Sequence, residues 1–287
     1  MMFFVLAGGY GKRAEPLSLL KPKPAFPLGG VPLLALLLEQ LRGLGCRRGF
    51  VNLHHLGAQV AAAAGGGTGI RFIREETLSG SRVLQQALPF IAAAGLLAVN
   101  GDTFLEIPLA EMAQRAADPQ VDGVLVARPD RSGRYGRLLC SGDDLLESVP
   151  PAPAGEAGLM YAGAALFKKK ALALIDDDNF FASIRRHRLR FRVVRHEGIW
   201  LDIGTPASYF QANWDFMAHR AQAGDNALSP GAKVAPTAQV RRSVLWESAR
   251  IGPGVSLCDC IVAGGPALEN ESHSGRIITP LGSFPLF

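Results

Sequence analysis

A chain of 287 residues with 48% hydrophobic residues can form one large domain, or a domain with an appendage, around a substantial core. Its net charge of +5 suits anionic small molecules; because no basic stripe is interleaved with aromatic side chains, we expect no nucleic-acid partner. No apolar stretch approaches the roughly 18 residues of a membrane span. The four cysteines are too few and too scattered for a disulfide scaffold, and the N-terminal apolar run lacks a charged leader, so we expect a cytoplasmic protein.

Short apolar runs alternate with helix-like segments over the first half of the chain. The expected strands are Phe3–Ala7, Phe50–Leu53, Ile70–Ile73, Leu96–Val99 and Val121–Ala127. The expected helices are Leu33–Leu44, Leu56–Ala63, Ser81–Ala94 and Leu109–Ala117. This alternation predicts an α/β domain with a parallel sheet covered by helices on both faces. In such sheets ligands bind beyond the carboxyl ends of the strands.

The middle of the chain, from about residue 130 to residue 199, is less regular. Strands are expected at Tyr161–Phe167 and Phe191–Arg195, and the prolines of residues 150–153 mark a loop. The arginine-rich run of residues 185–192 alternates with apolar residues, which suggests the edge of a strand.

The C-terminal segment has a period of its own, built from a small residue followed two positions later by an aliphatic one. The aliphatic positions Val234 and Ile251, Val240 and Leu257, and Leu245 and Val262 are each 17 residues apart. Steps of 6, 5 and 6 residues per lap predict a triangular left-handed parallel β-helix with one short strand on each side. Since fewer than about three turns are marginal alone and about two are visible, this tail should pack on the main domain or on another subunit.

The segment Leu6–Pro27, LAGGYGKRAEPLSLLKPKPAFP, combines a glycine-rich turn with nearby cations directly after the first expected strand. Glycines let backbone N–H groups approach a ligand closely, and amides beside cations suit a polyphosphate. A P-loop is excluded because Lys12 has the wrong spacing and is followed by Arg13. The dinucleotide fingerprint fits Gly9-x-Gly11-x-x-Ala14, but it lacks the acidic residue required about 20 positions later.

Two aspartates stand at the ends of short apolar segments, where carboxylates can bind a metal. Asp102 follows the expected strand Leu96–Val99 in the sequence VNGD, and Asp202 lies between Leu201 and Ile203 in WLDIGTP. A buried aspartate flanked by apolar residues costs stability unless it is paired or bound to metal. A turn aspartate or a helix N-cap is the alternative for either residue taken alone.

Together these motifs resemble the signature of the sugar-phosphate nucleotidyltransferases, the nucleotide-diphosphate-sugar pyrophosphorylases, and especially mannose-1-phosphate guanylyltransferase-like proteins with a hexapeptide-repeat tail. The resemblance rests on GGYGKRAEPL with KPKP, on VNGD, on WLDIGTP and on the tail, and so spans nearly the whole chain. It implies a Rossmann-like doubly wound mixed sheet at residues 1–222 and a left-handed β-helix at residues 226–287, and a homo-oligomer formed through this tail is an expectation of the same resemblance.

The resemblance also implies a reaction in which a nucleoside triphosphate and a sugar-1-phosphate give a nucleotide sugar and pyrophosphate, with Mg²⁺ as cofactor. Arg13 and Lys23 would be catalytic, and Asp102 and Asp202 would hold Mg²⁺. The residues implied to bind nucleotide are Leu6, Ala7, Gly8, Gly9, Gly11, Gly80, Asn100 and Gly101. Glu147 and Gly163 would bind the sugar phosphate, and GTP with mannose-1-phosphate is the favoured substrate pair.

One family feature is missing. Many members carry Glu-Lys followed by Pro in the middle region. This chain has Glu147-Ser148-Val149-Pro150 instead, with no lysine there. A neighbouring cation, Arg128, Arg131 or Arg134, is the candidate replacement. The alternatives are a uridylyl- or cytidylyltransferase acting on another phosphorylated sugar or alcohol, or a non-catalytic subunit that senses nucleotide sugars.

Overall fold

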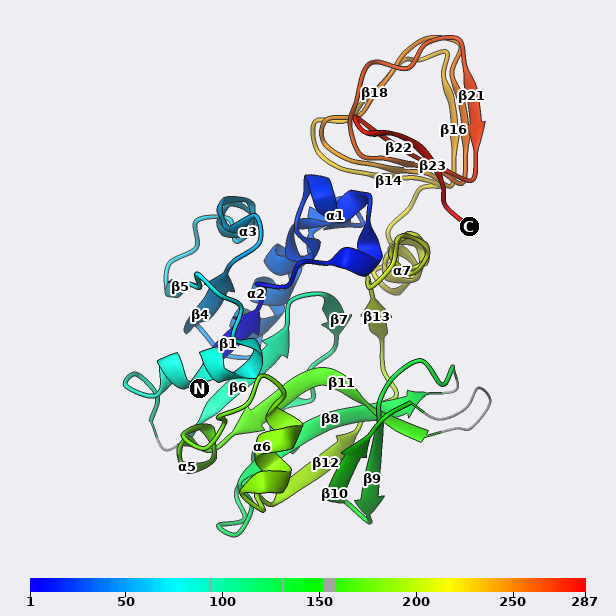
Figure 1. Cartoon of the computed structure of the whole chain (residues 1–287). Coiled ribbons are helices and arrows are strands. Elements are labelled where there is room, and N and C mark those ends of the chain that lie inside the picture. The colour runs from blue at the N-terminus through cyan, green and yellow to red at the C-terminus, as the bar shows by residue number, and fades with distance from the viewer. Residues whose placement is uncertain (93, 131, 152–157) are drawn as a thin grey trace.

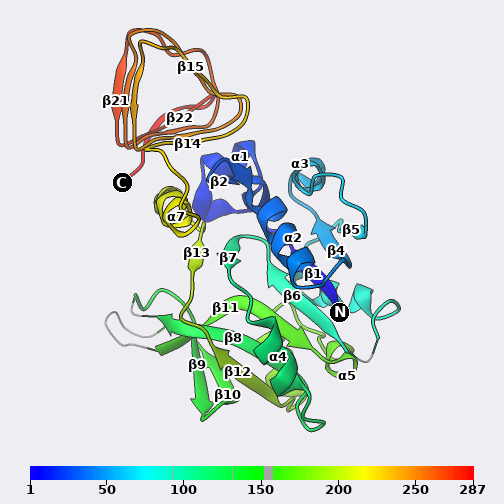
Figure 2. The same ribbon diagram turned by 180° about the vertical axis from the view of Figure 1, so that it is seen from behind.

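The protein consists of an α/β domain followed by a coil of short strands, and the two parts can be told apart in the ribbon views (Figures 1 and 2). The computed structural model describes residues 1–92, 94–130, 132–151 and 158–287. Helix α7 (Pro206–His219) connects the two parts and lies between them (Figure 1). Arg131, one of the candidate replacements for the missing lysine, lies outside the described residues.

A nine-stranded sheet forms the centre of the α/β domain, in the order β5-β4-β1-β6-β11-β8-β12-β10-β9. Its strands are β1 (Met2–Leu6), β4 (Arg48–Leu53), β5 (Ile70–Arg74), β6 (Leu96–Asn100), β8 (Gly123–Asp130), β9 (Arg137–Ser141), β10 (Asp144–Val149), β11 (Gly158–Phe167) and β12 (Phe191–Arg195). Strand β1 runs parallel to β4 and β6, whereas β11 runs antiparallel to both β6 and β8. The mixed sheet implied by the family resemblance is therefore present.

Alternate residues of the central strands belong to two hydrophobic clusters, one on each face of the sheet. In β1, Phe3 and Val5 belong to the first cluster and Phe4 to the second. The first face is covered by α2 (Leu33–Gly43), α3 (Gly57–Ala63), α4 (Leu109–Ala116) and α7. The second is covered by α5 (Lys169–Leu172), α6 (Phe180–Arg186) and the 3₁₀ segment η3 (Gly80–Ala87). The sheet is doubly wound because strands apolar at every position must be covered on both sides.

Two sequence predictions in this domain are wrong in part. The helix expected at Ser81–Ala94 is a 3₁₀ segment that ends at Ala87. The run 185–192, expected at a strand edge, contains the end of α6, a turn, and the start of β12, which lies between β8 and β10 inside the sheet. In both places a helix or turn is imposed by packing against the sheet rather than by the local pattern of residues.

The remaining short elements of the domain connect these layers. They are η1 (Lys12–Ala14), α1 (Leu17–Leu20), η2 (Lys23–Ala25), β2 (Pro27–Leu28), β3 (Val31–Pro32), β7 (Thr103–Leu105) and β13 (Trp200–Asp202). Strand β13 pairs antiparallel with β7, outside the large sheet. Within the part of the chain that the structure describes, no helix is long and apolar enough to cross a membrane.

The tail forms a three-sided coil of parallel strands (Figure 1), and its last strand, β23, runs antiparallel to β22. Its strands are β14 (Ala227–Leu228), β15 (Lys233–Val234), β16 (Gln239–Arg241), β17 (Val244–Leu245), β18 (Arg250–Ile251), β19 (Ser256–Cys258), β20 (Ile261–Val262), β21 (Ser272–Ser274), β22 (Arg276–Thr279) and β23 (Gly282–Pro285). Val234 pairs with Ile251, Val240 with Leu257 and Leu245 with Val262, as the 17-residue period predicts.

The coil continues one lap further than the sequence period indicates. Strand β21 pairs with β19, and β22 pairs with β20, but the partners Leu257 and His273 are 16 residues apart rather than 17. The shorter lap breaks the period, so the sequence repeat ends one lap before the coil does. The coil's own core contains Leu245, Ile251 and Leu257, whereas Trp246, Val244 and Ala263 belong to the cluster of the α/β domain. The expected packing of the tail on the main domain is therefore present.

Candidate active site

A cavity of about 440 Å³ opens at the carboxyl ends of β1 and β6. It is lined by nine of the residues predicted from sequence: Leu6, Ala7, Gly8, Gly9, Gly11, Lys23, Gly80, Asn100 and Asp102. Segments far apart in the chain meet here because β1 and β6 are adjacent and parallel, so the turns that follow them leave the sheet at the same edge.

The glycine turn after β1 is held close to neighbouring chain segments. The N–H of Ala7 donates to the Asn52 side-chain oxygen at 2.6 Å, and a Cβ at Gly8 would lie 2.7 Å from the Asn52 amide nitrogen. Gly11 has φ +69°, a left-handed conformation that favours glycine. No atom lies within 4 Å of the position that a Cβ on Gly9 would take, and Gly9 lines the cavity.

A second loop, residues 75–81, closes another side of the cavity. The Glu75 carboxylate accepts hydrogen bonds from the Asn52 amide at 2.5 Å and from the backbone N–H of Ser79 at 3.1 Å. Asn52 therefore joins the glycine turn, through its side-chain oxygen, to this loop, through its amide nitrogen. Gly80 has φ +55°, and a Cβ there would lie 2.4 Å from the carbonyl oxygen of Asp178, so only glycine fits without a shift of backbone.

Lys23 and Asp102 form an ion pair at the floor of the cavity, with 3.1 Å between the ammonium nitrogen and a carboxylate oxygen. The Lys23 side chain is 9% exposed and that of Asp102 is 38% exposed. Gly101 precedes Asp102 and lies behind the cavity; a Cβ there would be 2.7 Å from the carbonyl oxygen of Leu6. The close approach of the β1 and β6 turns thus requires glycine at this position.

The backbone of Asp202 lies beside that of Asp102 because β13, which ends at Asp202, pairs with β7, which begins directly after Asp102. Asp202 is in register with Thr103, and the N–H of Ile203 donates to the carbonyl oxygen of Asp102 at 3.4 Å. The Asp202 carboxylate accepts a hydrogen bond from the Tyr135 hydroxyl at 2.9 Å. Burial, followed by the Asp202 charge, raises the pKa of Tyr135 above its ordinary value, so this hydroxyl remains a donor.

Five predicted site residues do not line this cavity: Arg13, Gly101, Glu147, Gly163 and Asp202. Arg13 lies in η1 (Lys12–Ala14), directly after the glycine turn. Gly163 packs behind Asn100, where its Cβ would lie 3.4 Å from that side chain. Glu147 lies on β10 in an adjoining cavity of about 360 Å³ and pairs with Arg185 at 3.5 Å.

The candidate cations for the missing lysine have other contacts. The Arg128 guanidinium lies 4.9 Å from the centre of the Trp200 ring, and burial lowers the pKa of Arg128. Arg134 lies 5.8 Å from the centre of the Tyr135 ring. Both line a third cavity of about 480 Å³, which Tyr135 and Trp200 also line. Through Tyr135 this third cavity borders the Asp202 carboxylate.

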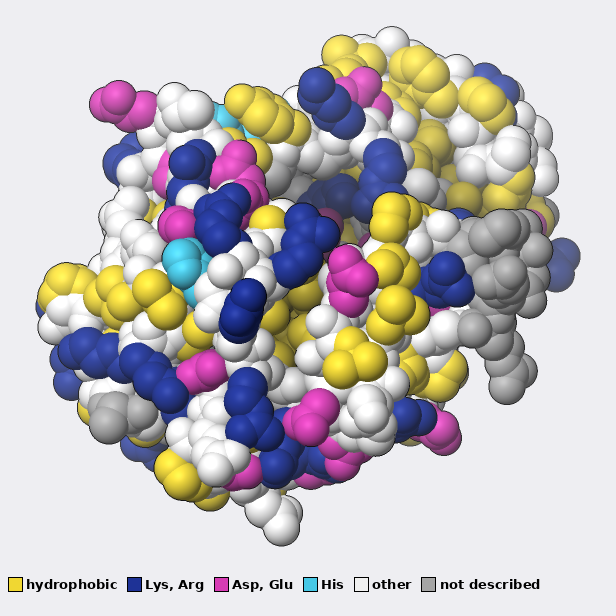
Figure 3. Space-filling view, turned by 60° about the horizontal axis from the view of Figure 1, so that its bottom comes forward, with side chains coloured by type: hydrophobic (Ala, Val, Ile, Leu, Met, Phe, Trp, Pro, Cys, Tyr) yellow, Lys and Arg dark blue, Asp and Glu magenta, His cyan; other side chains and the backbone are white. Residues whose placement is uncertain are grey.

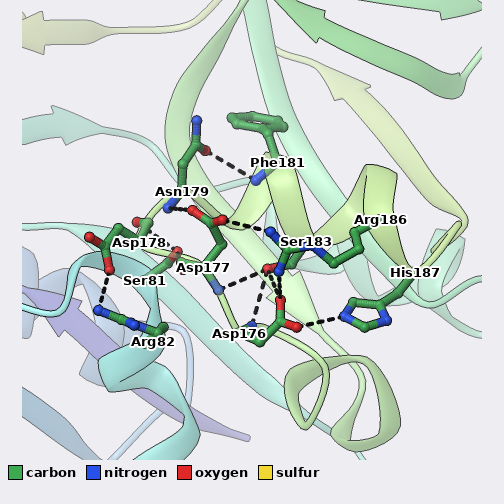
Figure 4. Close-up of polar contacts among 10 residues, drawn as sticks. All are labelled: Ser81, Arg82, Asp176, Asp177, Asp178, Asn179, Phe181, Ser183, Arg186 and His187. Atoms are coloured by element: carbon green, nitrogen blue, oxygen red, sulfur yellow. Dashed lines mark hydrogen bonds and ion pairs between the residues drawn. The ribbon is translucent and has the colours of Figure 1, made fainter.

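The sequence did not single out the residues that form the far wall of the first cavity. Tyr161 from β11 and the segment 178–181 line it opposite the glycine turn. Figure 4 shows how this segment is tied to the loop after residue 79: the Ser81 hydroxyl donates to the carbonyl oxygens of Asp177 and Asp178, and Arg82 pairs with Asp178 at 2.7 Å. The sequence feature that could have indicated this wall is the run of four polar residues, 176–179, directly before two phenylalanines.

Asp102 and Asp202 come from neighbouring backbone segments, and their residue type suits Mg²⁺, because this ion takes one or two protein carboxylates and completes its shell with phosphate oxygens and water. Among the residues that the structure describes, no third histidine, cysteine or acidic side chain joins them in a metal-sized cluster. The set therefore suits a cation shared with a phosphate ligand rather than one enclosed by protein. Figure 3 shows Lys and Arg side chains gathered around a hollow on this side of the molecule, with acidic side chains among them.

A glycine-lined cavity beside an ammonium and two carboxylates, at the carboxyl edge of a doubly wound sheet, defines an α/β enzyme that handles nucleotides. Residues 3–218 match the family model described as nucleotidyl transferase, and the chain belongs to this family. Within it, the chain is a sugar-phosphate nucleotidyltransferase.

The chain is 30% identical over 225 residues to the N-acetylmuramate alpha-1-phosphate uridylyltransferase of Neisseria meningitidis serogroup B, covering 71% of this chain and 94% of that protein. It is 23% identical over 291 residues to the mannose-1-phosphate guanylyltransferase of Mycobacterium tuberculosis, covering 92% of this chain and 80% of that protein. The crystal structure of HddC from Yersinia pseudotuberculosis complexed with GMP-PN has the same fold, with a TM-score of 0.64 and 24% identity over 75% of this chain and 98% of that chain.

Proposed function

We propose that this enzyme carries out Mg²⁺-dependent transfer of a nucleoside monophosphate from a nucleoside triphosphate to a sugar-1-phosphate, with GTP and mannose-1-phosphate as the preferred pair. The observation that carries the proposal is the approach of Asp102 and Asp202 to each other at the edge of a glycine-lined cavity, with Lys23 paired to Asp102. The mannose-1-phosphate guanylyltransferase that matches over 92% of this chain, tail included, supports the choice of substrates.

In this reaction an oxygen of the sugar phosphate forms a bond to the α-phosphorus of the triphosphate. The bond from the α-phosphorus to the bridging oxygen breaks, and pyrophosphate leaves. Because both reactants are anions, the barrier consists largely of charge repulsion and positioning. Bound Mg²⁺, held by Asp102 and Asp202, would supply positive charge at the phosphate oxygens.

The remaining roles fall to residues on opposite sides of the cavity. The backbone of the glycine turn, residues 8–11, would bind the triphosphate, and Arg13 would neutralise charge at its rim. Lys23 is largely buried and would exchange its partner Asp102 for a phosphate oxygen when substrate binds. Tyr161 and Phe181 would form an apolar wall for the sugar, next to the cavity that contains Glu147.

A uridylyltransferase is the second candidate, and one comparison favours it. The relative with 30% identity is a uridylyltransferase that acts on N-acetylmuramate alpha-1-phosphate, whereas the mannose-1-phosphate guanylyltransferase is 23% identical. The uridylyltransferase match covers 71% of this chain, whereas the guanylyltransferase match covers 92%.

Release of pyrophosphate with Mg²⁺ tests the proposal directly. GTP, UTP, dTTP, CTP and ATP are each combined with mannose-1-phosphate, glucose-1-phosphate and N-acetylmuramate-1-phosphate. Release with GTP and mannose-1-phosphate is the expected result. Release only with UTP would establish the second candidate. Nucleotide binding without release from any pair would instead favour a non-catalytic subunit that senses nucleotide sugars.

Three finer expectations belong to the same proposal. The three-sided coil is proposed to be left-handed, as a hexapeptide-repeat tail would be, and to provide a surface for homo-oligomer formation. The enzyme is proposed to act in the cytoplasm, where nucleoside triphosphates are available. Size-exclusion chromatography with light scattering, on the full chain, measures the oligomeric state.

A further inference from the structure

The segment that carries Lys23 is contacted at both ends by residues that join it to the tail. At its start, the Lys21 ammonium forms an ion pair with the Glu247 carboxylate of the tail. At its end, the carbonyl oxygen of Pro27 accepts a hydrogen bond from the Tyr209 hydroxyl of α7 at 2.6 Å. Lys23 lies between these two fixed points and faces the other way, toward Asp102.

Trp246 of the tail connects the two fixed points. Its indole N–H donates to the Tyr209 oxygen at 3.0 Å, and its ring lies 5.0 Å from the Lys21 ammonium. Phe26 packs between them, with ring centres 5.1 Å from Tyr209 and 5.2 Å from Trp246. Trp246 is 2% exposed, so the tail is inserted into the α/β domain at this point rather than resting on its surface.

The backbone between the fixed points transmits their position to Lys23. Pro22 and Pro24 flank Lys23 and restrict φ on both sides, and Pro22 is extended with φ −71° and ψ 146°. Only Pro22 lies between Lys21 and Lys23 along this stiff backbone, so a shift at Lys21 moves the Lys23 ammonium as well. Transfer reactions lose rate steeply when a charged group is misplaced by about 1 Å.

A cavity of about 640 Å³ lies against Lys21, Trp246 and Glu247, between the tail and the α/β domain. Lys21, at the start of the segment, therefore borders a cavity on this side rather than closely packed side chains. Loss of the Lys21–Glu247 contact would therefore leave Lys21 free to move into that space. Burial opposes ionisation of Glu247, but the hydrogen bond and charge of Lys21 hold the pKa of its carboxyl below the ordinary value.

We propose that Glu247 is a positioning residue for catalysis: through Lys21, and beside Trp246, the C-terminal coil holds the 21–27 segment so that Lys23 lies at the phosphate site. This role rests on the proposed function of Lys23. The coil is then part of the catalytic apparatus of its own chain, in addition to any role in assembly.

The test compares Glu247→Gln, Lys21→Met and the double variant with the wild-type full-length enzyme. Each single variant should lower kcat about tenfold, with KM for the triphosphate changed less than about twofold, and the double variant should lose no more than either. Because a half-exposed ion pair contributes little to stability, Tm should remain within about 2 °C of wild type. Asp259→Asn is the matched control, since it breaks the tail ion pair with Arg242, remote from Lys21, and should leave kcat unchanged.

Hydrogen–deuterium exchange of the peptide that spans residues 21–28 gives a readout independent of turnover. Exchange should rise in Glu247→Gln and remain at the wild-type level in Asp259→Asn. Unchanged exchange, or full kcat in Glu247→Gln, would overturn the positioning role. Absence of turnover in the wild-type enzyme would contradict the proposed function instead, and the exchange experiment would still decide whether the tail holds the segment.

Discussion

The two walls of the active-site cavity are built in different ways. The wall with the glycine turn and Asp102 comes from residues 6–11 and 100–102, two short segments that directly follow adjacent parallel strands. The other wall comes from Tyr161 on an antiparallel strand and from residues 178–181, where α6 begins. The first wall, the motif wall, has a composition that indicates its function. The second, the assembled wall, consists of residues that acquire a role only because distant chain segments meet there.

The largest effect is expected from the two aspartates, Asp102 in the motif wall and its backbone neighbour Asp202. Asp102→Ala and Asp202→Ala should each lower kcat by about 1,000-fold or more, because the carboxylates that would hold Mg²⁺ are lost. Pyrophosphate release measures the loss, and circular dichroism and Tm establish that the fold is retained. Asp215→Ala, an exposed position on α7, is the control. Full turnover by either aspartate variant would remove that residue from the metal site.

A smaller effect is expected from the residue that supports the motif wall. Asn52→Ala should weaken nucleotide binding about tenfold, since the Ala7 N–H and the Glu75 carboxylate both lose a buried partner. Isothermal titration with the triphosphate measures the affinity. Asn226→Ala is the matched control, because Asn226 makes comparable hydrogen bonds to Val240 and Ser243 within the tail. Equal affinity in both variants would mean that Asn52 does not hold the turn.

The assembled wall is expected to affect the sugar more than the nucleotide. Phe181→Ala should raise KM for the sugar phosphate about fivefold through loss of apolar contact, with a smaller change in KM for the triphosphate. Steady-state kinetics with each substrate varied in turn separates the two. Phe90→Ala, an exposed phenylalanine outside the cavity, controls for loss of a ring. A larger change for the triphosphate would assign this wall to the base.

The smallest effect is expected on thermal stability, through Asp176, which lies in the chain just before the residues of the assembled wall. A hydrogen bond from His187, with further ones from Ser183 and Arg186, lowers the pKa of Asp176 to about 2 (Figure 4). Because the folded-state pKa lies below the ordinary value, Asp176 stabilises the fold above about pH 4, and this contribution is lost as pH falls toward about 2.

Thermal unfolding across that pH range tests this sign. Asp176→Asn should lower Tm slightly at neutral pH and make Tm less dependent on pH in the acid range, whereas Asp215→Asn should leave the dependence unchanged. An identical acid dependence in wild type and Asp176→Asn would contradict the assignment.

Most of the α/β domain was predictable because buried parallel strands are continuous apolar runs, as in Leu96–Asn100, and the helices between them have helical spacing. The tail was predictable for a similar reason, since its aliphatic residues recur at a fixed interval until the last lap shortens. The 3₁₀ segment Gly80–Ala87 was not, because its geometry depends on the contact of Gly80 with Asp178 from a distant part of the chain.

The sequence by itself determined the chemistry available to this protein: a glycine turn, two lysines in a proline-stiffened segment, an aspartate directly after an apolar strand and another inside a short apolar strand. These are local patterns, set by the conformational freedom of glycine and proline and by the ionisation of single side chains. Only the tertiary structure decided which of these groups meet. Asp202 reaches Asp102 through the pairing of β13 with β7, and Glu247 reaches Lys21 from 226 residues away, since such contacts depend on how the elements pack.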